Sequence, residues 1–495
     1  MPARSLPNNP SFEHLRKEAK RLRAAVRDGD DAARARVAEF HPRAGEAPGR
    51  FALADAQLVT ARSYGFASWA LLKQHLAEVE PIIWTPPPPP DPHALPDVFI
   101  RLACLTYLGW RPSFPEKARR MLAEHPELAS ASIDAAAAVG DVAVVRRMID
   151  EDPALVNRKG GPLHWEPLLY ACYSRLDDGV RSEWSTAGVV RLLLSRGANP
   201  DAGFLFDGLY AFTALTGAFG RGEDWPNQPP HAACDAVARL LLESGADPND
   251  SQALYNRHFQ PDDEHLLLLF EYGLGQDKGG PWLKRLTGEN ATPQKILVQQ
   301  LCWAAMRHFF HRVTLLIDHG VDLNTPSLRS GRTPYQEALR AGHAAMAEYL
   351  LARGAKTIEL DPVEMFALDC IAGRRDEVRA RLARDPGLLE RLGHQGQVDM
   401  LHRAAGRKQH EGVLMILELG VDINGMVPGT GLDRTVLHNA AGWAGLEMVT
   451  FLLELGADPN LRDPTYHATP LGWALHNEQH DVAGYLRPLT SGGVE

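Results

Sequence analysis

Residues 435–460 read TVLHNAAGWAGLEMVTFLLELGADPN, and this stretch decides the fold. A second stretch, DMLHRAAGRKQHEGVLMILELGVDIN over residues 399–424, repeats its order of small, polar and apolar residues. A third, TPLGWALHNEQHDVAGYL, follows over residues 469–486. The two longer stretches each place an Ala-Ala pair ahead of a leucine-rich run that ends in glycine. Self-similarity of this kind indicates a stacked array of units, and a chain of 495 residues is also too long for one hydrophobic core.

The pattern inside a unit predicts two short helices. A threonine such as Thr469 caps the first helix, and the proline after it has its φ preset for the helix. The Ala-Ala pair leaves room for a neighbouring helix to approach closely. The second helix buries its leucine face against the next unit, and the closing glycine supplies the left-handed conformation at the helix end. Because no unit is stable alone, stacking must build one continuous core.

These stretches resemble the ankyrin repeat, whose signature is T-P-L-H-x-A-A followed by a leucine-rich run that ends in Gly-Ala-Asp-x-Asn. Copies of the pattern close at Gly197, Gly245, Gly273, Gly320, Gly354, Gly420 and Gly456. Two further copies, at residues 134–157 and 366–390, close with Asp-Pro, and a weaker copy covers residues 102–129. The resemblance implies an all-α fold, an ankyrin-repeat solenoid of about eleven units with short hairpin loops. The array is expected to span residues 98–488, followed by a C-terminal tail at 489–495.

Residues 1–80 do not follow the repeat and are predicted to form a small helical N-terminal module. Residues 11–29 fit an amphipathic helix with its apolar residues on one face. Two more helices are expected over residues 51–66 and 68–79. This part resembles a helical module that precedes ankyrin arrays in bacterial proteins. Residues 81–97, which include TPPPPPDP, are predicted to be a stiff proline-rich linker between module and array.

Composition and charge exclude several classes of protein. The net charge is −10, and the positive excess is confined to residues 1–80, so nucleic acid is not expected as a main partner. No run of about 18 apolar residues is present, and the start of the chain does not read as a secretory signal, so we expect no membrane contact. The five cysteines are widely spaced, which favours a reducing cytoplasm and argues against a zinc site. We therefore predict a cytoplasmic protein with no cofactor and no bound metal.

Two consecutive units carry insertions between their helices. In a regular unit about 7 residues separate the second Ala from the first Val of the next helix. The equivalent separations in these two units are 17 and 18 residues. Insertions are therefore expected around 174–188 and 220–235, and an extra connection follows around 275–295. In a solenoid such insertions map to loops on one face, which is often the binding face.

The unit over residues 251–274 departs most from the pattern. When it is aligned on its closing glycine, Arg257 and His258 fall in the positions of the Ala pair. Large polar side chains there would clash or lie buried without a partner. If their role is structural, we expect them to pair with acids from the loops, such as Asp224 or Glu183.

Residues 164–295 are predicted to form a shaped pocket or contact surface. Its aromatic anchors and polar groups are Trp165, Trp184, Trp225, Tyr255 and Trp282, together with Arg221, Glu223, Asp224, Arg257 and His258. Paired insertions are where loops tend to carry function, and aromatic anchors with arginine are typical of binding sites. The opposing interpretation is that the aromatic side chains pack the loops down and that the charged groups are solvated.

A cluster of acids lies inside this region. Asp262, Asp263, Glu264 and His265, with His258 nearby, fit the residue types of a metal site or an acid–base site. Adjacent acids at a helix start are well explained by the helix dipole. We therefore assign no metal ligand and no catalytic residue to this cluster.

Two functions remain open from the sequence. The resemblance to ankyrin repeats implies a protein–protein interaction scaffold, and the acidic balance favours a partner protein with a basic or mixed surface. The alternative is an enzyme or small-ligand-binding protein whose pocket is formed by the insertions of residues 164–295, with a small molecule as the partner. No GxGxxG, GxxxxGK(S/T), HExxH or GxSxG motif stands in its required context, which removes the well-marked enzyme families without deciding between the two functions.

Overall fold

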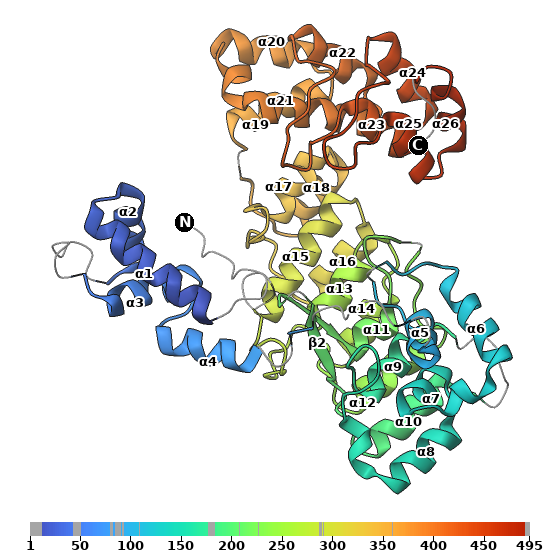
Figure 1. The fold of residues 1–495 in the computed structure, drawn as a ribbon. Helices are drawn as coiled ribbons and strands as arrows, with labels where there is room; N and C mark the ends of the chain where they lie inside the picture. The colour runs from blue at the N-terminus through green and yellow to red at the C-terminus, as the bar shows by residue number, and fades with distance from the viewer. Residues whose placement is uncertain are drawn as a thin grey trace. The chain divides into compact units, whose positions relative to one another are not determined.

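A computed structural model describes residues 12–42, 51–79, 83–84, 91, 94–107, 109–176, 184–206, 208–225, 227–286, 290, 292–358 and 360–490. The described chain is mostly helical (Figure 1). Its contacts divide it into two compact units, Met1–Glu337 and Ala338–Glu495, and each unit is described here by itself.

The first unit begins with four helices. They are α1 (Phe12–Asp28), α2 (Asp31–Phe40), α3 (Leu53–Ser63) and α4 (Trp69–Val79). The apolar face expected for residues 11–29 is buried in α1, where Leu15, Ala19, Leu22 and Val26 lie on the inner side. Helix α2 follows α1 directly because Asp30 caps it by accepting a hydrogen bond from the amide of Ala33.

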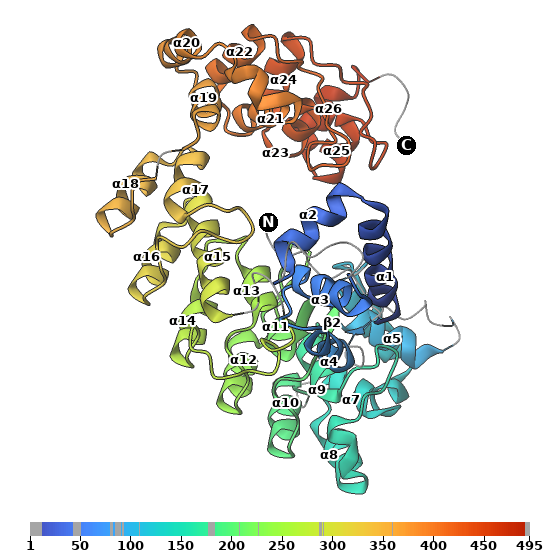
Figure 2. The same cartoon turned by 90° about the vertical axis from the view of Figure 1, so that its left-hand side faces the viewer.

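Helix pairs then follow one another along the first unit. The described pairs are α5 (Leu95–Ala103) with α6 (Phe114–Glu124), α7 (Ile133–Val139) with α8 (Val142–Glu151), α9 (Pro167–Tyr173) with α10 (Thr186–Ser195), α11 (Ala214–Phe219) with α12 (Cys234–Glu243), α13 (Ser251–Arg257) with α14 (Glu264–Glu271), and α15 (Pro293–Met306) with α16 (Phe310–Asp318). Short 3-10 helices at Pro126–Ser130 and Pro153–Asn157 follow α6 and α8. Figure 2 shows the first helices from α7 to α15 in one row and their partners from α8 to α16 in a second row beside it. This is the arrangement expected of stacked units.

The second unit continues the pattern. Its helices are α18 (Ala344–Ala352), α19 (Pro362–Ile371), α20 (Arg375–Arg384), α21 (Leu388–Gly406), α22 (His410–Glu418), α23 (Val436–Trp443), α24 (Leu446–Glu454), α25 (Pro470–His476) and α26 (His480–Leu486), and α17 (Pro334–Ala341) crosses the boundary between the units. The predicted threonine caps are present, because Thr435 and Thr469 accept hydrogen bonds from the amides of His438 and Gly472. One buried apolar cluster runs from Phe366 on α19 to the last helix, so the stacked units share a core.

A small sheet interrupts the helices of the first unit. Strands β2 (Gly203–Phe206) and β3 (Tyr210–Thr213) form an antiparallel hairpin, and β1 (Ile83–Trp84) pairs with β2 in parallel. From the sequence, short hairpin loops are expected around residues 203–213 and a proline-rich linker over residues 81–97, whereas β1 lies inside that linker and α5 begins in it. The missed signal is the Asp-Gly dipeptide at 207–208 between two aromatic-rich runs, which is typical of a two-stranded hairpin. The prediction of a mostly helical repeat protein is confirmed, and the number of units stays a prediction.

Candidate functional site

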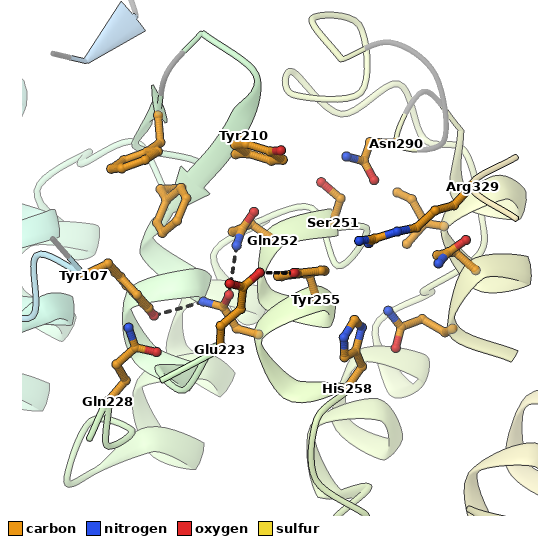
Figure 3. Close-up of a pocket in the computed structure, with 17 residues that line it drawn as sticks. Tyr107, Tyr210, Glu223, Gln228, Ser251, Gln252, Tyr255, His258, Asn290 and Arg329 are labelled. Carbon is orange, nitrogen blue, oxygen red and sulfur yellow. Dashed lines mark hydrogen bonds between the residues drawn. The ribbon is translucent and has the colours of Figure 1, made fainter. Parts of the chain in front are cut away.

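A cavity of about 440 Å³ lies in the first unit (Figure 3). Six segments surround it: the loop after α5, the β2–β3 hairpin, the insertion around 220–235, helix α13 with His258 at its end, Asn290 with α15, and the loop after α16. The described lining residues are Tyr107, Phe206, Tyr210, Phe212, Gly222, Glu223, Gln228, Ser251, Gln252, Tyr255, Asn256, His258, Asn290, Ile296, Gln299, Gln300 and Arg329. The volume lies within the range of roughly 300–1,000 Å³ that is usual for small-molecule sites.

One side of the cavity is an aromatic wall made of Tyr107, Phe206, Tyr210 and Phe212. The ring of Phe212 lies 5.1 Å from that of Tyr107 and 5.2 Å from that of Phe206, between centroids. Tyr107 has a φ of 63°, a left-handed conformation that is rare for a bulky residue. The backbone is therefore held in an unfavourable conformation at a residue that faces the cavity, and strain of this kind clusters at functional sites.

The opposite side carries a chain of polar contacts. Asn256 donates a hydrogen bond from Nδ2 to the hydroxyl of Tyr107 over 3.0 Å, and Gln252 donates from Nε2 to Oδ1 of Asn256 over 2.8 Å. The hydroxyl of Tyr255 donates to the carboxylate of Glu223, as Figure 3 shows. Burial raises the pKa of both Tyr107 and Tyr255, so both hydroxyls keep their protons and remain donors.

His258 forms part of the cavity lining and is only 1% exposed. Its ring stacks on the indole of Trp303 with the centroids 4.1 Å apart, and the Trp303 indole N–H donates to the carbonyl oxygen of His258 over 3.1 Å. Burial and the nearby arginines, first among them Arg312, lower the pKa of His258 to about 3. The imidazole is therefore neutral at physiological pH, with one ring nitrogen a donor and the other an acceptor.

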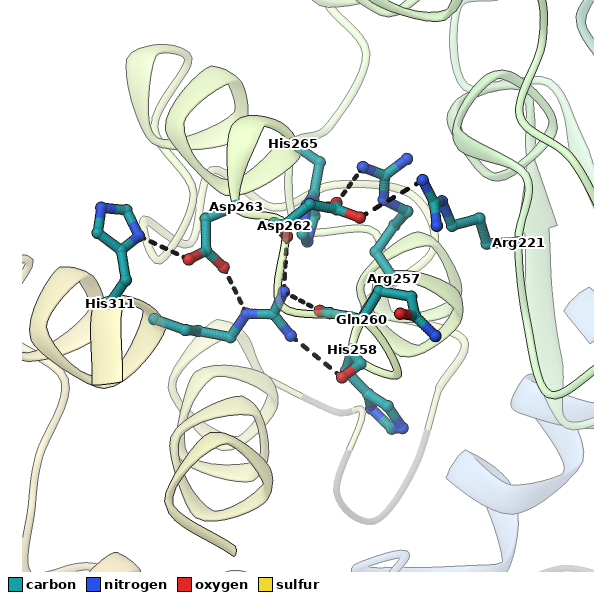
Figure 4. A network of polar contacts seen from close by, with 9 residues as sticks. Arg221, Arg257, His258, Gln260, Asp262, Asp263, His265 and His311 are labelled. Carbon is teal, nitrogen blue, oxygen red and sulfur yellow. Dashed lines mark hydrogen bonds and ion pairs between the residues drawn. The ribbon is translucent and has the colours of Figure 1, made fainter. Parts of the chain in front are cut away.

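A buried arginine holds the turn that follows His258 (Figure 4). Arg312 is fully buried, and its Nε donates to the carboxylate of Asp263 over 2.6 Å. Its two terminal nitrogens donate to the carbonyl oxygens of His258, Gln260 and Asp262 over 3.1, 2.6 and 2.6 Å. A guanidinium from the next repeat thus fixes the position of His258 through its backbone.

Arg257 is buried and pairs with an acid of its own unit. Its Nη2 contacts the carboxylate of Asp262, which Arg221 also approaches at 3.4 Å. The expected structural pairing of Arg257 with Asp224 is therefore not observed, and Glu183 lies outside the described residues. Arg221 comes from the insertion around 220–235, so this shared carboxylate ties that insertion to the repeat behind it.

The register of α13 also differs from the prediction. Counting from the helix caps, which are Asp250 for α13 and a threonine for α23, places Tyr255 and Asn256 at the positions of the Ala pair. Arg257 and His258 come two residues later, at the helix end. The reason is a longer turn, because six residues join α13 to α14 whereas two join α23 to α24. An alignment on the closing glycine alone is therefore two residues out of register.

Two carboxylates of the acid cluster, those of Asp262 and Asp263, pair with arginine and histidine side chains of the protein. Asp263 accepts from Arg312 and also from His311 Nδ1 over 2.7 Å, while Asp262 pairs with two arginines. Glu264 is exposed, and burial lowers the pKa of His265. In the described ranges no group of three His, Cys, Asp or Glu residues is placed to hold a metal ion. These carboxylates stabilise the turn between α13 and α14.

Arg175 joins the two insertions and was not anticipated from the sequence. It is buried, and its Nε donates to the carbonyl oxygen of Pro229 over 2.8 Å. Its Nη2 donates to the carbonyl of Gly217 over 2.9 Å, and Nη1 donates to that of Ser174 over 2.8 Å. One guanidinium thereby links the residues that flank the insertion around 174–188 to the insertion around 220–235.

The predicted site residues fall into separate groups. Glu223, Tyr255 and His258 line the cavity, while Arg221 and Arg257 lie beside it in the pairing with Asp262. The other five, Trp165, Trp184, Asp224, Trp225 and Trp282, are not part of the described lining.

Two of these tryptophans pack the protein interior. The ring of Trp165 stacks on that of Phe204 at 5.2 Å, and the indole N–H of Trp282 donates to the carbonyl of Asp201 over 2.9 Å. Trp184 is half-buried, whereas Asp224 and Trp225 are exposed.

Most of the lining residues could not be predicted from the sequence. The aromatic wall comes from the loop after α5 and from the hairpin, and four of the six carboxamides come from α13 and α15. Tyr107 and Arg329 are separated by more than 200 positions in the chain, so no local pattern connects them. The Asp-Gly turn signal was the one local clue that pointed to the hairpin.

The second unit carries an exposed aromatic group, the C-terminal aromatic surface, made of Arg434, Trp443, Tyr466 and Trp473. Trp443 is 58% exposed and Tyr466 is 72% exposed. The guanidinium of Arg434 lies 5.6 Å from the ring centroid of Trp443 and 4.9 Å from that of Trp473. Trp473 also meets Trp443 and Tyr466 edge to face, at 5.4 and 6.0 Å. Four side chains from three successive segments are thus held together at the surface.

Comparison with known families agrees with the repeat pattern. A family model described as ankyrin repeats in three copies matches residues 401–492, and one described as ankyrin repeats in many copies matches residues 301–351. No curated protein matches the chain significantly. Within the described part of the chain, no helix has the length and apolar character needed to cross a membrane.

Proposed function

Because this chain is an ankyrin repeat protein, we propose that it serves as an interaction scaffold and that the C-terminal aromatic surface binds a partner protein. Ankyrin repeats are in general protein–protein interaction modules. The observation that supports the proposal is the exposure of Trp443 and Tyr466 around an arginine, inside the longer family match. Tryptophan, tyrosine and arginine are the residue types most enriched at binding hot spots.

Arg434 and Trp473 of this surface are held by contacts within the protein. Arg434 lies against two indole rings, and the indole N–H of Trp473 donates to the carboxylate of Asp463 over 3.0 Å. A partner would therefore lose little side-chain entropy on binding to them. The net charge of −10 favours a partner with a basic or mixed surface, and cytoplasmic localisation remains part of the same proposal.

The test is a selection of displayed random peptides on the full chain, followed by affinity measurement. Trp443→Ala should weaken the selected peptides by about 30-fold, since a hot-spot truncation costs roughly 2 kcal/mol or more. The matched control is Tyr485→Ala, which removes a 42% exposed tyrosine from α26. Peptides that bind wild type, Trp443→Ala and Tyr485→Ala equally would contradict the assignment of this surface.

The cavity supports a second candidate function, the binding of a small ligand. Its volume, its aromatic wall and its convergent polar groups are those of a small-molecule site. The test is mass spectrometry of the full chain, first under native conditions and then after denaturing extraction. A small molecule should co-purify with the wild type and be absent from Tyr210→Ala, which removes an exposed part of the wall. A wild-type protein free of any bound molecule, and unresponsive to a broad ligand screen, would contradict this second function.

A further inference from the structure

Two buried side chains of the cavity lining carry polar atoms that have no hydrogen-bond partner within the described part of the chain. Neither ring nitrogen of His258 is in a hydrogen bond, and Oε1 of Gln300 accepts none. The two residues are 1% and 3% exposed. Figure 3 shows His258 on the side of the cavity that also carries Tyr255 and Arg329. Leaving buried polar atoms unpaired is unfavourable, so these atoms point to a ligand that forms hydrogen bonds with them.

The charges of the lining favour a neutral ligand. Glu223 and Arg329 are the two charged side chains among the described lining residues, and they have opposite signs. Both are exposed, and the carboxylate of Glu223 already accepts a hydrogen bond from the hydroxyl of Tyr255. A cation buried next to His258 and Gln300 would have no carboxylate of the buried lining to compensate its desolvation, and for an anion the buried guanidinium of Arg312 is already paired with the carboxylate of Asp263.

The uncharged polar groups of the lining indicate which functional groups the ligand carries. Six carboxamides contribute, from Gln228, Gln252, Asn256, Asn290, Gln299 and Gln300, together with three tyrosine hydroxyls and Ser251. Each of these groups offers both donors and acceptors, as does a neutral imidazole. A hydroxyl group on the ligand is the natural complement, because it donates and accepts at the same time. A purely apolar ligand would leave His258 and Gln300 unpaired.

The aromatic wall requires an apolar face on the same molecule. Tyr107, Phe206, Tyr210 and Phe212 present rings on one side, opposite the carboxamides of α13 and α15. A sugar ring has both properties, since its C–H face is apolar and its edge carries hydroxyls. Resting on the small-ligand function proposed above, we propose that this cavity binds a neutral carbohydrate of one or two sugar units. The hydroxyls of the sugar form hydrogen bonds with the imidazole of His258 and with Oε1 of Gln300, and one face of the sugar ring lies on the aromatic wall.

The experiment uses the full chain and saturation-transfer NMR with three panels of probes: neutral mono- and disaccharides, their phosphorylated or carboxylated forms, and nucleosides. A neutral sugar should bind saturably, and Kd should rise at least tenfold in Gln300→Leu. This replacement removes the unpaired carbonyl but keeps the size of the side chain, so the melting temperature should not fall. Tyr210→Ala, at a residue 47% exposed, should weaken binding without affecting folding, and Tyr485→Ala serves as the control.

The outcomes separate this inference from the small-ligand function. Binding of nucleosides or of charged sugars alone would overturn the carbohydrate assignment while the small-ligand function stands. The assignment is also overturned if a neutral sugar binds equally to wild type, Gln300→Leu and Tyr210→Ala, because the sugar then binds elsewhere. Absence of binding in all three panels, together with no co-purified molecule, would overturn both.

Discussion

Arg312 shows how a single side chain can position a site that it does not touch. Its guanidinium is fully buried and donates to one carboxylate and three carbonyl oxygens in the turn after α13. These bonds hold the backbone of His258, and with it an imidazole of the cavity lining. A lysine could not replace it, because one ammonium cannot reach acceptors that a planar guanidinium contacts on several sides.

Replacing Arg312 by methionine should destabilise the turn between α13 and α14. The change leaves the buried carboxylate of Asp263 without its main cation, which typically costs about 3–5 kcal/mol. Hydrogen exchange measured by mass spectrometry should show faster exchange over residues 251–318 than in the wild type. The matched control is Arg307→Met at an exposed arginine, where the expected change is within about 0.5 kcal/mol. Unchanged protection in Arg312→Met would show that the turn is held by other contacts.

Asp134 makes stability depend on pH. It is 5% exposed, its Oδ1 has no hydrogen-bond partner among the described residues, and burial raises its pKa to about 7. An ordinary aspartate in the unfolded chain has a pKa of 3.8, so between these values the folded state keeps a proton that the unfolded state loses. Stability contributed by this group therefore falls as pH rises through that window and stays low above it.

Asp134→Asn should remove this dependence. We expect the variant to be more stable than the wild type above about pH 8, by on the order of 2–4 kcal/mol, and nearly equal to it below about pH 4. Calorimetric melting at the two ends of this range checks the sign. Asp150→Asn, at an exposed aspartate, should show no comparable gain. A wild type that melts at the same temperature as Asp134→Asn at high pH would contradict the raised pKa.

At the scale of elements, the β2–β3 hairpin is the part of the fold that creates the cavity wall. It supplies Phe206, Tyr210 and Phe212, and its other face packs Leu205 and Ala211 against Trp282. Trp282 was expected to be a binding anchor, and its position explains why an aromatic residue stands there. It supports the hairpin from behind rather than meeting a ligand.

Gly203 at the start of β2 should not tolerate a side chain. A Cβ there would lie 2.6 Å from the carbonyl oxygen of Phe212 and 2.8 Å from the Trp282 ring. We expect Gly203→Ala to destabilise the first unit by about 1–3 kcal/mol through overpacking and to weaken ligand binding in the cavity. Melting temperature and tryptophan fluorescence are the measurements. Gly484→Ala, where no atom lies within 4 Å of the new Cβ, should be neutral or stabilising. Equal behaviour of the two variants would contradict this packing.

At the scale of the whole molecule, a repeat array is stabilised by contacts between neighbouring units, and its end units must tolerate solvent. Helices α25 and α26 bury Leu471, Val482 and Leu486 in the shared core of the second unit. Deleting residues 469–495 should therefore expose apolar surface of α23 and α24 and cause aggregation. Size-exclusion chromatography and binding of an apolar dye check this, with a chain ending after Thr490 as the control. A soluble truncation as stable as the control would show that these helices do not act as a cap.

The N-terminal module should be separable from the array. We expect a chain that starts near Asp97, close to the beginning of α5, to stay folded, because a proline-rich linker lets few contacts cross it. A second chain that starts at residue 81 keeps β1, which pairs with β2. Comparing their circular dichroism and melting separates loss of the module from loss of the strand. Collapse of both chains, or no proteolytic cleavage between residues 81 and 97 in the full chain, would contradict this boundary.

The repeat could be predicted from the sequence alone, because each unit is a local pattern of caps, small residues and leucines that can be recognised one unit at a time. Thr435 and Thr469 cap their helices as predicted, and the amphipathic α1 buries the predicted face. Such features depend on neighbours within a few positions of the chain. They are set by backbone and side-chain preferences that any single stretch of sequence carries.

The candidate site depends on contacts between segments that are distant in the chain. The lining joins Tyr107, the hairpin, α13 and Arg329, and the partners of Arg257 and Arg312 depend on how long each turn is. The turn after α13 has six residues, four more than the turn after α23, and Arg257 and His258 therefore lie two residues away from their predicted positions. Contacts between distant segments follow from stacking geometry, and a one-dimensional pattern does not contain the turn lengths and insertions that set that geometry.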